Sequence, residues 1–306
     1  MDELIFLSDL RGTSAADGVA EFARAQFFNT QLFSCEQESG PSDEGTCSWA
    51  SFNGTRTVVS NQTRFEDTTF SGAFGGQFEV FDNVFVGGAL AFEQSDTSRL
   101  FTDLDANRGR AGLTVKYVDS GFSGGLAVSG AIGNVDSTRT TSSGTALTDF
   151  GVTTLSARAR VAYTFGGDGW FVTPELAGGV TRVEGDGYSE TGAGINNRIV
   201  TSYEETSFSV HPAVTVGGDF RIGPFDTLVR PSLTLGVDWY DDPSVSVGSG
   251  VVTIAERVSA DDFLGRAGVN LDVFADQDVA IRLRYNGLYG ESTKSHGGEV
   301  RVQLDF

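Results

Sequence analysis

Apolar and polar residues alternate along the chain in strand-length segments, most clearly at its C-terminal end. Between Val279 and Tyr289, apolar side chains take every second position, and Arg282 and Arg284 stand between them. The same alternation returns from residue 299 to 306. Because side chains repeat every two residues along a strand, each segment predicts a strand with one apolar face and one charged face.

Twelve segments of this kind follow one another along most of the chain. They are 48–58, 70–80, 84–94, 108–118, 122–134, 153–165, 170–183, 207–221, 227–240, 262–275, 279–289 and 295–306. Short turns between them alternate with longer polar stretches near 59–69, 95–107, 135–152, 184–206 and 241–261. This alternation is typical of a meandering barrel with turns at one end and loops at the other. The sequence therefore predicts an all-β transmembrane fold, a twelve-stranded antiparallel up-and-down β-barrel.

The polar faces of these segments carry full charges. Charged side chains on the hidden face of a soluble β-sandwich would each cost several kcal/mol unless they were paired. A water-filled lumen removes most of that cost, so we expect the charged faces to line a pore and the apolar faces to contact lipid. The expected lumen-lining residues are Arg110, Lys116, Arg158, Arg160, Glu175, His211, Asp219, Arg230, Asp238, Arg266, Asp272, Arg282 and Arg284.

A helix is predicted before the first strand. Residues 14–17 resemble a capping box with Asp17 in place of Glu, and they open the proline-free, alanine-rich run 15–32. At 1.5 Å per residue this helix would be about 27 Å long, close to the thickness of a bilayer core. Its polar side chains exclude a lipid-facing position, so we expect it in the lumen, where its small residues would ease the fit. An amphipathic helix lying against another surface is the alternative.

Composition narrows the membrane class. The mean hydropathy is -0.10, and no apolar run approaches the roughly 20 residues of a membrane-spanning helix, which excludes a helical membrane protein. The net charge of -20 makes nucleic acid an unsuitable partner. No secretory signal precedes the fold, because Met1 is followed directly by Asp2 and Glu3. We therefore expect an N-terminal part that is missing from this chain.

Few residues offer candidate chemistry. Cys35 and Cys47 predict a disulfide in an oxidising compartment, with two free thiols as the alternative, and no neighbouring His or Cys suggests a metal site. The two histidines, His211 and His296, fall in different parts of the predicted barrel, so we expect no shared catalytic site and no enzyme. Acidic pairs in the loops 241–242 and 261–262 are expected to be solvated rather than metal-binding, and no cofactor is expected.

Several short motifs resemble the translocator domain of classical (type V) autotransporters of Gram-negative bacteria. They are Trp49-Ala50-Ser51-Phe52, Trp170-Phe171-Val172-Thr173-Pro174-Glu175-Leu176, Gly187-Tyr188-Ser189-Glu190, Val229-Arg230-Pro231, Val237-Asp238-Trp239, Arg284-Tyr285-Asn286-Gly287 and Ser295-His296-Gly297-Gly298. The apolar positions Val302 and Leu304 and the terminal aromatic Phe306 resemble the closing strand that the outer-membrane barrel assembly machinery reads as a signal.

The resemblance implies a function and a division of the chain. Residues 1–13 would be a passenger or linker remnant, 14–34 a pore-spanning helix, 35–46 a periplasmic connector and 47–306 the barrel. The domain would lie in the outer membrane as a monomer, contact lipid and lipopolysaccharide, and support export of its own N-terminal passenger. Asn29 matches no cleavage pattern closely enough to be carried over. The alternative function is a porin-like diffusion channel without a passenger.

Overall fold

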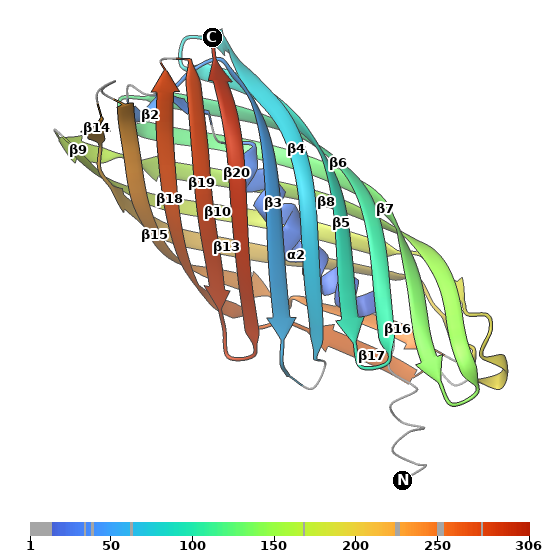
Figure 1. Cartoon of the computed structure of the whole chain (residues 1–306). Coiled ribbons are helices and arrows are strands. Elements are labelled where there is room, and N and C mark those ends of the chain that lie inside the picture. Colours follow the sequence, from blue (N-terminus) through green and yellow to red (C-terminus); the bar gives the residue numbers. More distant parts are fainter. Residues whose placement is uncertain are drawn as a thin grey trace.

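The computed structural model describes residues 14–33, 35–37, 40–61, 64–167, 169–223, 227–249, 254–276 and 278–306. Figure 1 shows these residues as a barrel of long, tilted strands with the helix α2 (Ser14–Gln31) inside it. The wall consists of β3 (Cys47–Val59), β4 (Phe65–Phe81), β5 (Val84–Arg99), β6 (Thr102–Asp119), β7 (Phe122–Thr141), β8 (Gly144–Tyr163), β10 (Trp170–Gly185), β13 (Tyr203–Gly217), β15 (Thr227–Asp241), β18 (Phe263–Asp276), β19 (Val279–Tyr289) and β20 (Thr293–Asp305).

Each wall strand pairs antiparallel with its neighbours, and the sheet closes on itself. The last strand β20 pairs with the first strand β3, where Val300 lies opposite Phe52. β13 and β15 also pair, so the ring has no free edge among its long strands. The predicted twelve-stranded antiparallel barrel with an N-terminal helix in its lumen is therefore confirmed. Closure satisfies the backbone hydrogen bonds that an open edge would leave unpaired in lipid.

The two faces of the wall differ as the alternation predicts. Large apolar side chains point outward, such as Phe74, Leu113 and Leu155, which are 53%, 64% and 64% exposed. The intervening arginines Arg158 and Arg282 point inward and are buried. The barrel therefore has an apolar outer band and a polar interior. This arrangement suits a wall with lipid outside it and a hydrated or ion-paired lumen inside it.

Two of the expected loops are strands instead. β5 and β6 meet at a two-residue turn, 100–101, and β7 and β8 meet at another, 142–143. The expectation of loops over 95–107 and 135–152 is wrong. These stretches are polar because their outer face is in water beyond the lipid, although the strands remain paired. Along the two strands of this hairpin the inward residues include the buried Thr97 and Leu104, while outward residues such as Asp96 and Asp103 are polar. The exposed apolar residues Leu100 and Phe101 form the turn. In Figure 1, β7 and β8 extend well past the end of β3 and β20.

The remaining long connections carry small elements. β11 (Tyr188–Ser189), β12 (Ile199–Val200), β16 (Ser244–Ser249) and β17 (Ile254–Ser259) form a four-stranded sheet, and η1 (Gly194–Asn196) lies between β11 and β12. β1 (Glu36–Gln37) pairs with β2 (Gly40–Glu44) ahead of β3, while β9 (Phe165–Gly167) and β14 (Phe220–Ile222) are short pieces beside β10 and β15. We call the barrel end with the long connections the loop end and the opposite end, where β20 finishes, the turn end.

The helix differs slightly from its prediction. It ends at Gln31, and two turn residues follow it, whereas the expected pore helix continued to residue 34. The expected passenger remnant, residues 1–13, lies outside the described residues. Among the described residues, no helix has both the length and the apolar character needed to cross a bilayer.

Candidate functional site

The lumen and the helix within it form the candidate functional site. α2 runs along the barrel with its N-terminal end at the loop end (Figure 1). Its sequence contains no proline, and Asp17 in the first turn places a negative charge near the positive end of the helix dipole. The side chains of Asp17, Glu21 and Arg24 are nevertheless buried rather than solvated. Their partners therefore decide whether the helix is stable in this position.

The three charged helix residues first bind one another. The Arg24 guanidinium donates to the Asp17 carboxylate at 2.7 Å and to the Glu21 carboxylate at 2.9 Å. It also reaches the wall, donating to Asp67 of β4 at 3.0 Å and lying 3.3 Å from a carboxylate oxygen of Glu93 on β5. A single arginine thus joins the helix to two neighbouring strands.

Two arginines of the wall strand β6 pair with the acidic residues of the helix. Arg108 forms an ion pair with Asp17, and its Nε lies 3.6 Å from Glu21. Arg110 donates to Glu21 at 2.5 Å. Removing one member of such a buried set leaves an uncompensated charge, at a cost of about 3–5 kcal/mol. The network therefore fixes both the height and the rotation of the helix in the barrel.

Below the ion network, amide side chains continue the attachment. Gln26 donates to Thr181 at 2.9 Å and to Ser156 at 3.1 Å, and Asn29 donates to the same Ser156 oxygen at 3.0 Å. Gly179 of β10 makes this approach possible, because a Cβ at that position would lie 2.5 Å from the Gln26 side chain. The helix consequently packs closely against β8 and β10.

The loop end of the lumen is apolar. The water-filled lumen with charged walls that we expected is not found there, because several inward positions near the rim carry apolar side chains packed around the helix. Val245 of β16 lies against Gly18, where an added Cβ would be 3.0 Å from it. The packed set consists of Ala15, Ala16, Val19, Ala20, Phe22, Val59, Phe65, Leu104, Ala106, Val135, Phe150, Val152, Val183, Tyr188, Val200, Tyr203, Val245, Val247 and Val258.

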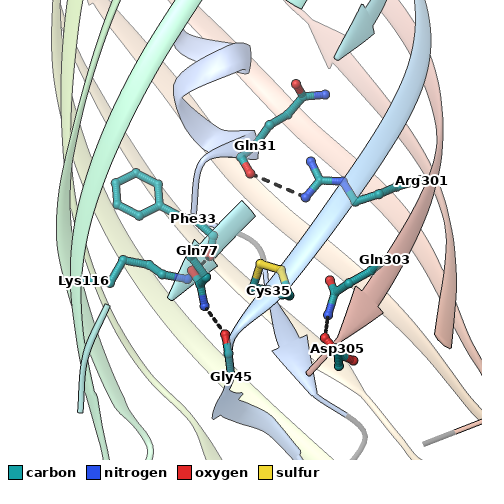
Figure 2. Close-up of a disulfide and its surroundings, with 10 residues drawn as sticks. Gln31, Phe33, Cys35, Gly45, Gln77, Lys116, Arg301, Gln303 and Asp305 are labelled. Atoms are coloured by element: carbon teal, nitrogen blue, oxygen red, sulfur yellow. Dashed lines mark hydrogen bonds between the residues drawn. A yellow bond between two sulfur atoms is a disulfide. The ribbon is translucent and has the colours of Figure 1, made fainter. Parts of the chain in front are cut away.

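Hydrogen bonds from the wall hold the C-terminal end of the helix (Figure 2). Lys116 Nζ donates to the Phe33 carbonyl at 3.0 Å, and Arg301 donates to the Gln31 carbonyl at 3.4 Å. The Arg301 guanidinium also lies over the Trp49 ring, 4.2 Å from its centroid. Two cations at the negative end of the helix dipole stabilise this terminus.

A disulfide joins the helix connector to the first barrel strand. Cys35 and Cys47 are bonded, with their Cα atoms 6.2 Å apart, and Figure 2 shows the bridge just below the helix. The enclosed segment is also tied to β4, because Gln77 donates to the Gly45 carbonyl at 2.9 Å. The connector is therefore held in place rather than left as a free chain.

Open space remains beside the helix. A cavity of about 260 Å³ separates the helix face that carries Ala23, Phe27 and Thr30 from β13, β15, β18 and β19. Its lining includes nine of the expected lumen residues: Arg158, Arg160, Glu175, His211, Arg230, Asp238, Arg266, Asp272 and Arg284. Ala23 borders the cavity and does not contribute to tight packing, whereas Ala16 and Ala25 are fully buried.

His211 belongs to a charged cluster in this region. Its Nδ1 lies 2.9 Å from the Asp238 carboxylate, its Nε2 lies 2.9 Å from Ser209 Oγ, and Arg266 also pairs with Asp238. The Ser209–His211–Asp238 series has the order of a hydrolase triad. Ser209 is, however, buried and absent from the cavity lining, so the cavity does not lead a substrate to it. His296 lies far from this cluster, on the outer face of β20.

Of the other expected lumen residues, Arg110 and Lys116 bind the helix, Arg282 is buried, and Asp219 lies partly exposed in the turn after β13. Arg160 donates to Glu175 at 2.8 Å, and Arg230 donates to Asp219 at 2.7 Å. Asp272 lies opposite Arg282 in the β18–β19 ladder. Within the described residues, no group of three or more His, Cys, Asp or Glu side chains is arranged to hold a metal ion. The expected assembly residues Val302, Leu304 and Phe306 lie on the exposed outer face of the turn end.

Sequence reasoning missed several partners of the helix, among them Asp67, Glu93, Arg108 and Arg301. Arg108 stands at the boundary between a predicted loop and a predicted strand, and Asp67 lies inside a predicted loop. Extending the two-residue alternation into those polar stretches would have placed both on the inward face. Their contact with Arg24 or Asp17 still depends on the register of the closed barrel.

Sequence comparison decides the family. The family model of the autotransporter beta-domain matches residues 48–286. The chain belongs to the autotransporter beta-domain family. It is accordingly a translocator domain of the outer membrane, and the family implies an N-terminal passenger that it exports and anchors. No curated protein sequence matches the chain significantly.

Solved autotransporter domains share this fold. The translocator domain of autotransporter NalP from Neisseria meningitidis has a TM-score of 0.76 and 13% identity, over 95% of this chain and 96% of that one. The transport unit of autotransporter AIDA-I from Escherichia coli has a TM-score of 0.72 and 12% identity, over 94% and 97%. The beta domain of the Bordetella autotransporter BrkA has a TM-score of 0.62 and 14% identity, over 86% and 100%.

Proposed function

We propose that α2 is the tether that stays in the barrel after the passenger has reached the cell surface, and that it closes the pore. The observation that carries this proposal is the buried ion network of Asp17, Glu21 and Arg24 with the wall. A segment that only passed through the barrel would gain nothing from charged partners matched to it. In this arrangement residues 14–34 form the tether and 47–306 the translocator barrel.

The same proposal sets the orientation of the barrel. The loop end faces the cell exterior and the turn end faces the periplasm, so that residues 35–46 are a periplasmic connector and 1–13 belong to the passenger or its linker. The short connections at the turn end support this orientation, because periplasmic turns of such barrels are short. The expected lumen-lining residues then serve to hold the tether and to hydrate the space beside it.

Further partners follow from the outer surface. Val302, Leu304 and Phe306 are 43%, 45% and 78% exposed at the turn end, which suits recognition by the barrel assembly machinery. The apolar band suits a monomer surrounded by lipid, with lipopolysaccharide at the loop end. We assign this domain no catalytic role and no cofactor. The Cys35–Cys47 bridge forms in the oxidising periplasm and holds the connector beneath the tether.

The cavity beside α2 is the feature that favours the alternative, a diffusion channel. Its 260 Å³ is room for several water molecules, but the helix that borders it is bound to the wall by ion pairs on the opposite side. A diffusion channel would need the helix to leave. We therefore favour the plugged translocator.

Surface proteolysis of intact cells tests the tether. A passenger with an epitope tag ahead of Ser14 is expressed with this domain, and the cells are treated with a protease that does not cross the outer membrane. The proposal predicts loss of the epitope while a peptide covering residues 14–31 remains intact by mass spectrometry. Recovery of the epitope undigested in intact cells, but digested after lysis, would contradict it.

A further inference from the structure

Exposed cations are concentrated at one place on this acidic protein. The chain carries a net charge of -20, and most arginines point into the lumen. In the described residues, the exposed lysines and arginines are Arg56, Arg64, Arg182, Arg221, Arg257 and Lys294. Arg56 of β3 and Lys294 of β20 lie near the loop end of the strands that close the barrel, and Arg64 lies in the connection from β3 to β4. The seam therefore carries an unusual share of the outward positive charge.

Register brings two of these cations beside the outer-face histidine. His296 of β20 lies directly opposite Arg56 of β3. Lys294 precedes His296 by two residues and lies on the same face of β20. Opposed residues on paired strands have Cβ atoms about 5 Å apart. The three side chains can therefore contact one ligand together.

Two tyrosines of β19 complete this group. Tyr285 Oη lies 2.6 Å from His296 Nδ1, and the Tyr289 ring stands edge-on to the imidazole at 5.3 Å. Both tyrosines are nearly half exposed. We call Arg56, Lys294, His296, Tyr285 and Tyr289 the seam cluster. The Tyr285 contact occupies Nδ1 of His296, and the histidine is exposed on the outer face of β20.

The seam cluster lies where the apolar band ends. Ten residues separate Phe306 from His296 on the outer face of β20, and Val300, Val302 and Leu304 stand between them. At about 3.4 Å per residue and a tilt of about 40°, this distance is about 26 Å along the membrane normal. The apolar band of such barrels is about 25 Å tall. Tyrosines are enriched at this boundary, where lipid headgroups begin.

The wall from β5 to β8 has the reverse charge at the loop end. Asp96, Asp105, Asp136 and Asp149 lie directly opposite one another across β5, β6, β7 and β8, all on the exposed face. An anionic ligand is repelled there and attracted to the seam. The acidic group nearest the cluster is Glu66, which pairs with Arg56 at 2.7 Å and would share it with a ligand. Lys294 has no ion-pair partner among the described residues.

We propose that the seam cluster binds the phosphorylated headgroup of a glycolipid of the outer leaflet. Arg56, Lys294 and His296 contact a phosphate, which both guanidinium and ammonium groups bind through charge-assisted hydrogen bonds. The tyrosines lie at the junction of headgroup and acyl chains, and the chains run along the apolar face of β20. This inference rests on the proposed orientation, with the loop end at the outer leaflet.

Lipid binding by the purified full chain tests the proposal. The probe is bis-phosphorylated lipid A, titrated into detergent-solubilised protein and followed by native mass spectrometry, with dephosphorylated lipid A and inorganic phosphate as comparison ligands. Each surface cation near a phosphate is worth about fivefold in affinity. The double variant R56Q/K294Q is therefore expected to bind lipid A about 25-fold more weakly. The matched control R182Q/R257Q removes two exposed cations elsewhere and should bind within twofold of the unmodified chain.

Each possible result bears on the proposal. Equal weakening in the control variant, or unchanged binding in R56Q/K294Q, would overturn it, as would equal affinity for dephosphorylated lipid A. Displacement of lipid A by an equimolar amount of inorganic phosphate would also overturn it, because the site would then bind an anion without recognising lipid. If the double variant fails to fold, K294Q alone, at an exposed residue, should still weaken binding about fivefold. Binding in detergent does not depend on barrel orientation, so its failure leaves the tether proposal standing.

Discussion

Glu21 is a fully buried carboxylate in the interior of a barrel whose outer face contacts lipid. Arg24 and Arg110 contact its two oxygens, and Arg108 lies nearby. None of the three arginines can release its proton under ordinary conditions, so the carboxylate is their necessary counter-charge. The residue acts as a fastening point between tether and wall.

Replacing Glu21 with Gln tests this role. The variant keeps the shape of the side chain but leaves the arginines with one fewer anion. We therefore expect the free energy of unfolding to fall by about 3 kcal/mol. Glu66→Gln is the matched control, because Glu66 also binds an arginine but at the surface, and it should cost less than about 1 kcal/mol. Urea unfolding followed by tryptophan fluorescence measures both. Equal losses in the two variants would contradict a buried network that holds the helix.

Asp261 predicts a pH dependence outside the membrane. Burial alone would raise the pKa of its carboxyl, but hydrogen bonds from Ser292 and Thr293 outweigh it and hold the pKa below the ordinary value of 3.8. The backbone amides of these two residues donate at 2.8 and 2.7 Å. Because the folded pKa is lowered, the stabilisation is complete above the unfolded pKa and is lost as pH falls through the folded one.

The measurement is hydrogen exchange of the β19–β20 hairpin. Protection of Ser292 and Thr293 should be constant from neutral pH down to about 5, after correction for intrinsic exchange, and should fall below about pH 4. Asp261→Asn, whose amide oxygen is an uncharged acceptor, should give weaker protection that no longer changes with pH. Protection that increases on acidification would have the wrong sign for a carboxylate acceptor.

At the scale of elements, alternation alone located the wall but not its ends. The segment 108–118 was placed correctly because Arg110, Leu113 and Lys116 alternate clearly. β7 continues to Thr141 although its last residues are polar on both the inward and the outward face. The strand remains hydrogen-bonded to its neighbours beyond the part of the barrel that contacts lipid. The apolar packing of Val245 against the helix could not be predicted either, because it depends on a loop folding back into the barrel.

The closing strand has its own test. Phe306 is 78% exposed at the turn end, and its backbone amide donates to the Thr46 carbonyl at 3.0 Å. Deleting Phe306 should impair membrane insertion while leaving the other exposed aromatics in place. Phe165→Ala removes an exposed aromatic near the same end and should insert normally, as judged by heat-modifiable gel mobility of membrane fractions. Normal insertion of the deletion variant would count against the assembly role.

The disulfide connector can be tested separately. The bridge closes a loop of twelve residues, for which the chain-entropy model gives about 3 kcal/mol of stabilisation. The free energy of unfolding of the double variant C35S/C47S should therefore be lower by about that amount. Reductant should not change the stability of this variant further. Identical mass and gel mobility of the natural chain with and without reduction and alkylation would refute the bridge.

At the scale of the whole molecule, the barrel and its helix depend on one another. The apolar outer face was predictable from every second residue, and so was the placement of charges such as Arg158 and Asp238 in the lumen. Which charges pair was not predictable, because Arg24 meets Asp67 only when the helix lies inside the closed barrel. The helix packs against β8 and β10 and leaves a cavity toward β13, β15, β18 and β19.

Single-channel conductance in planar bilayers tests the plugged barrel most directly. The full chain is compared with a variant that lacks residues 1–34 and retains the disulfide and every wall strand. The account predicts a small conductance for the full chain, carried by the cavity beside α2, and a much larger one when the helix is absent. Large and equal currents from both proteins would contradict a lumen closed by its own helix.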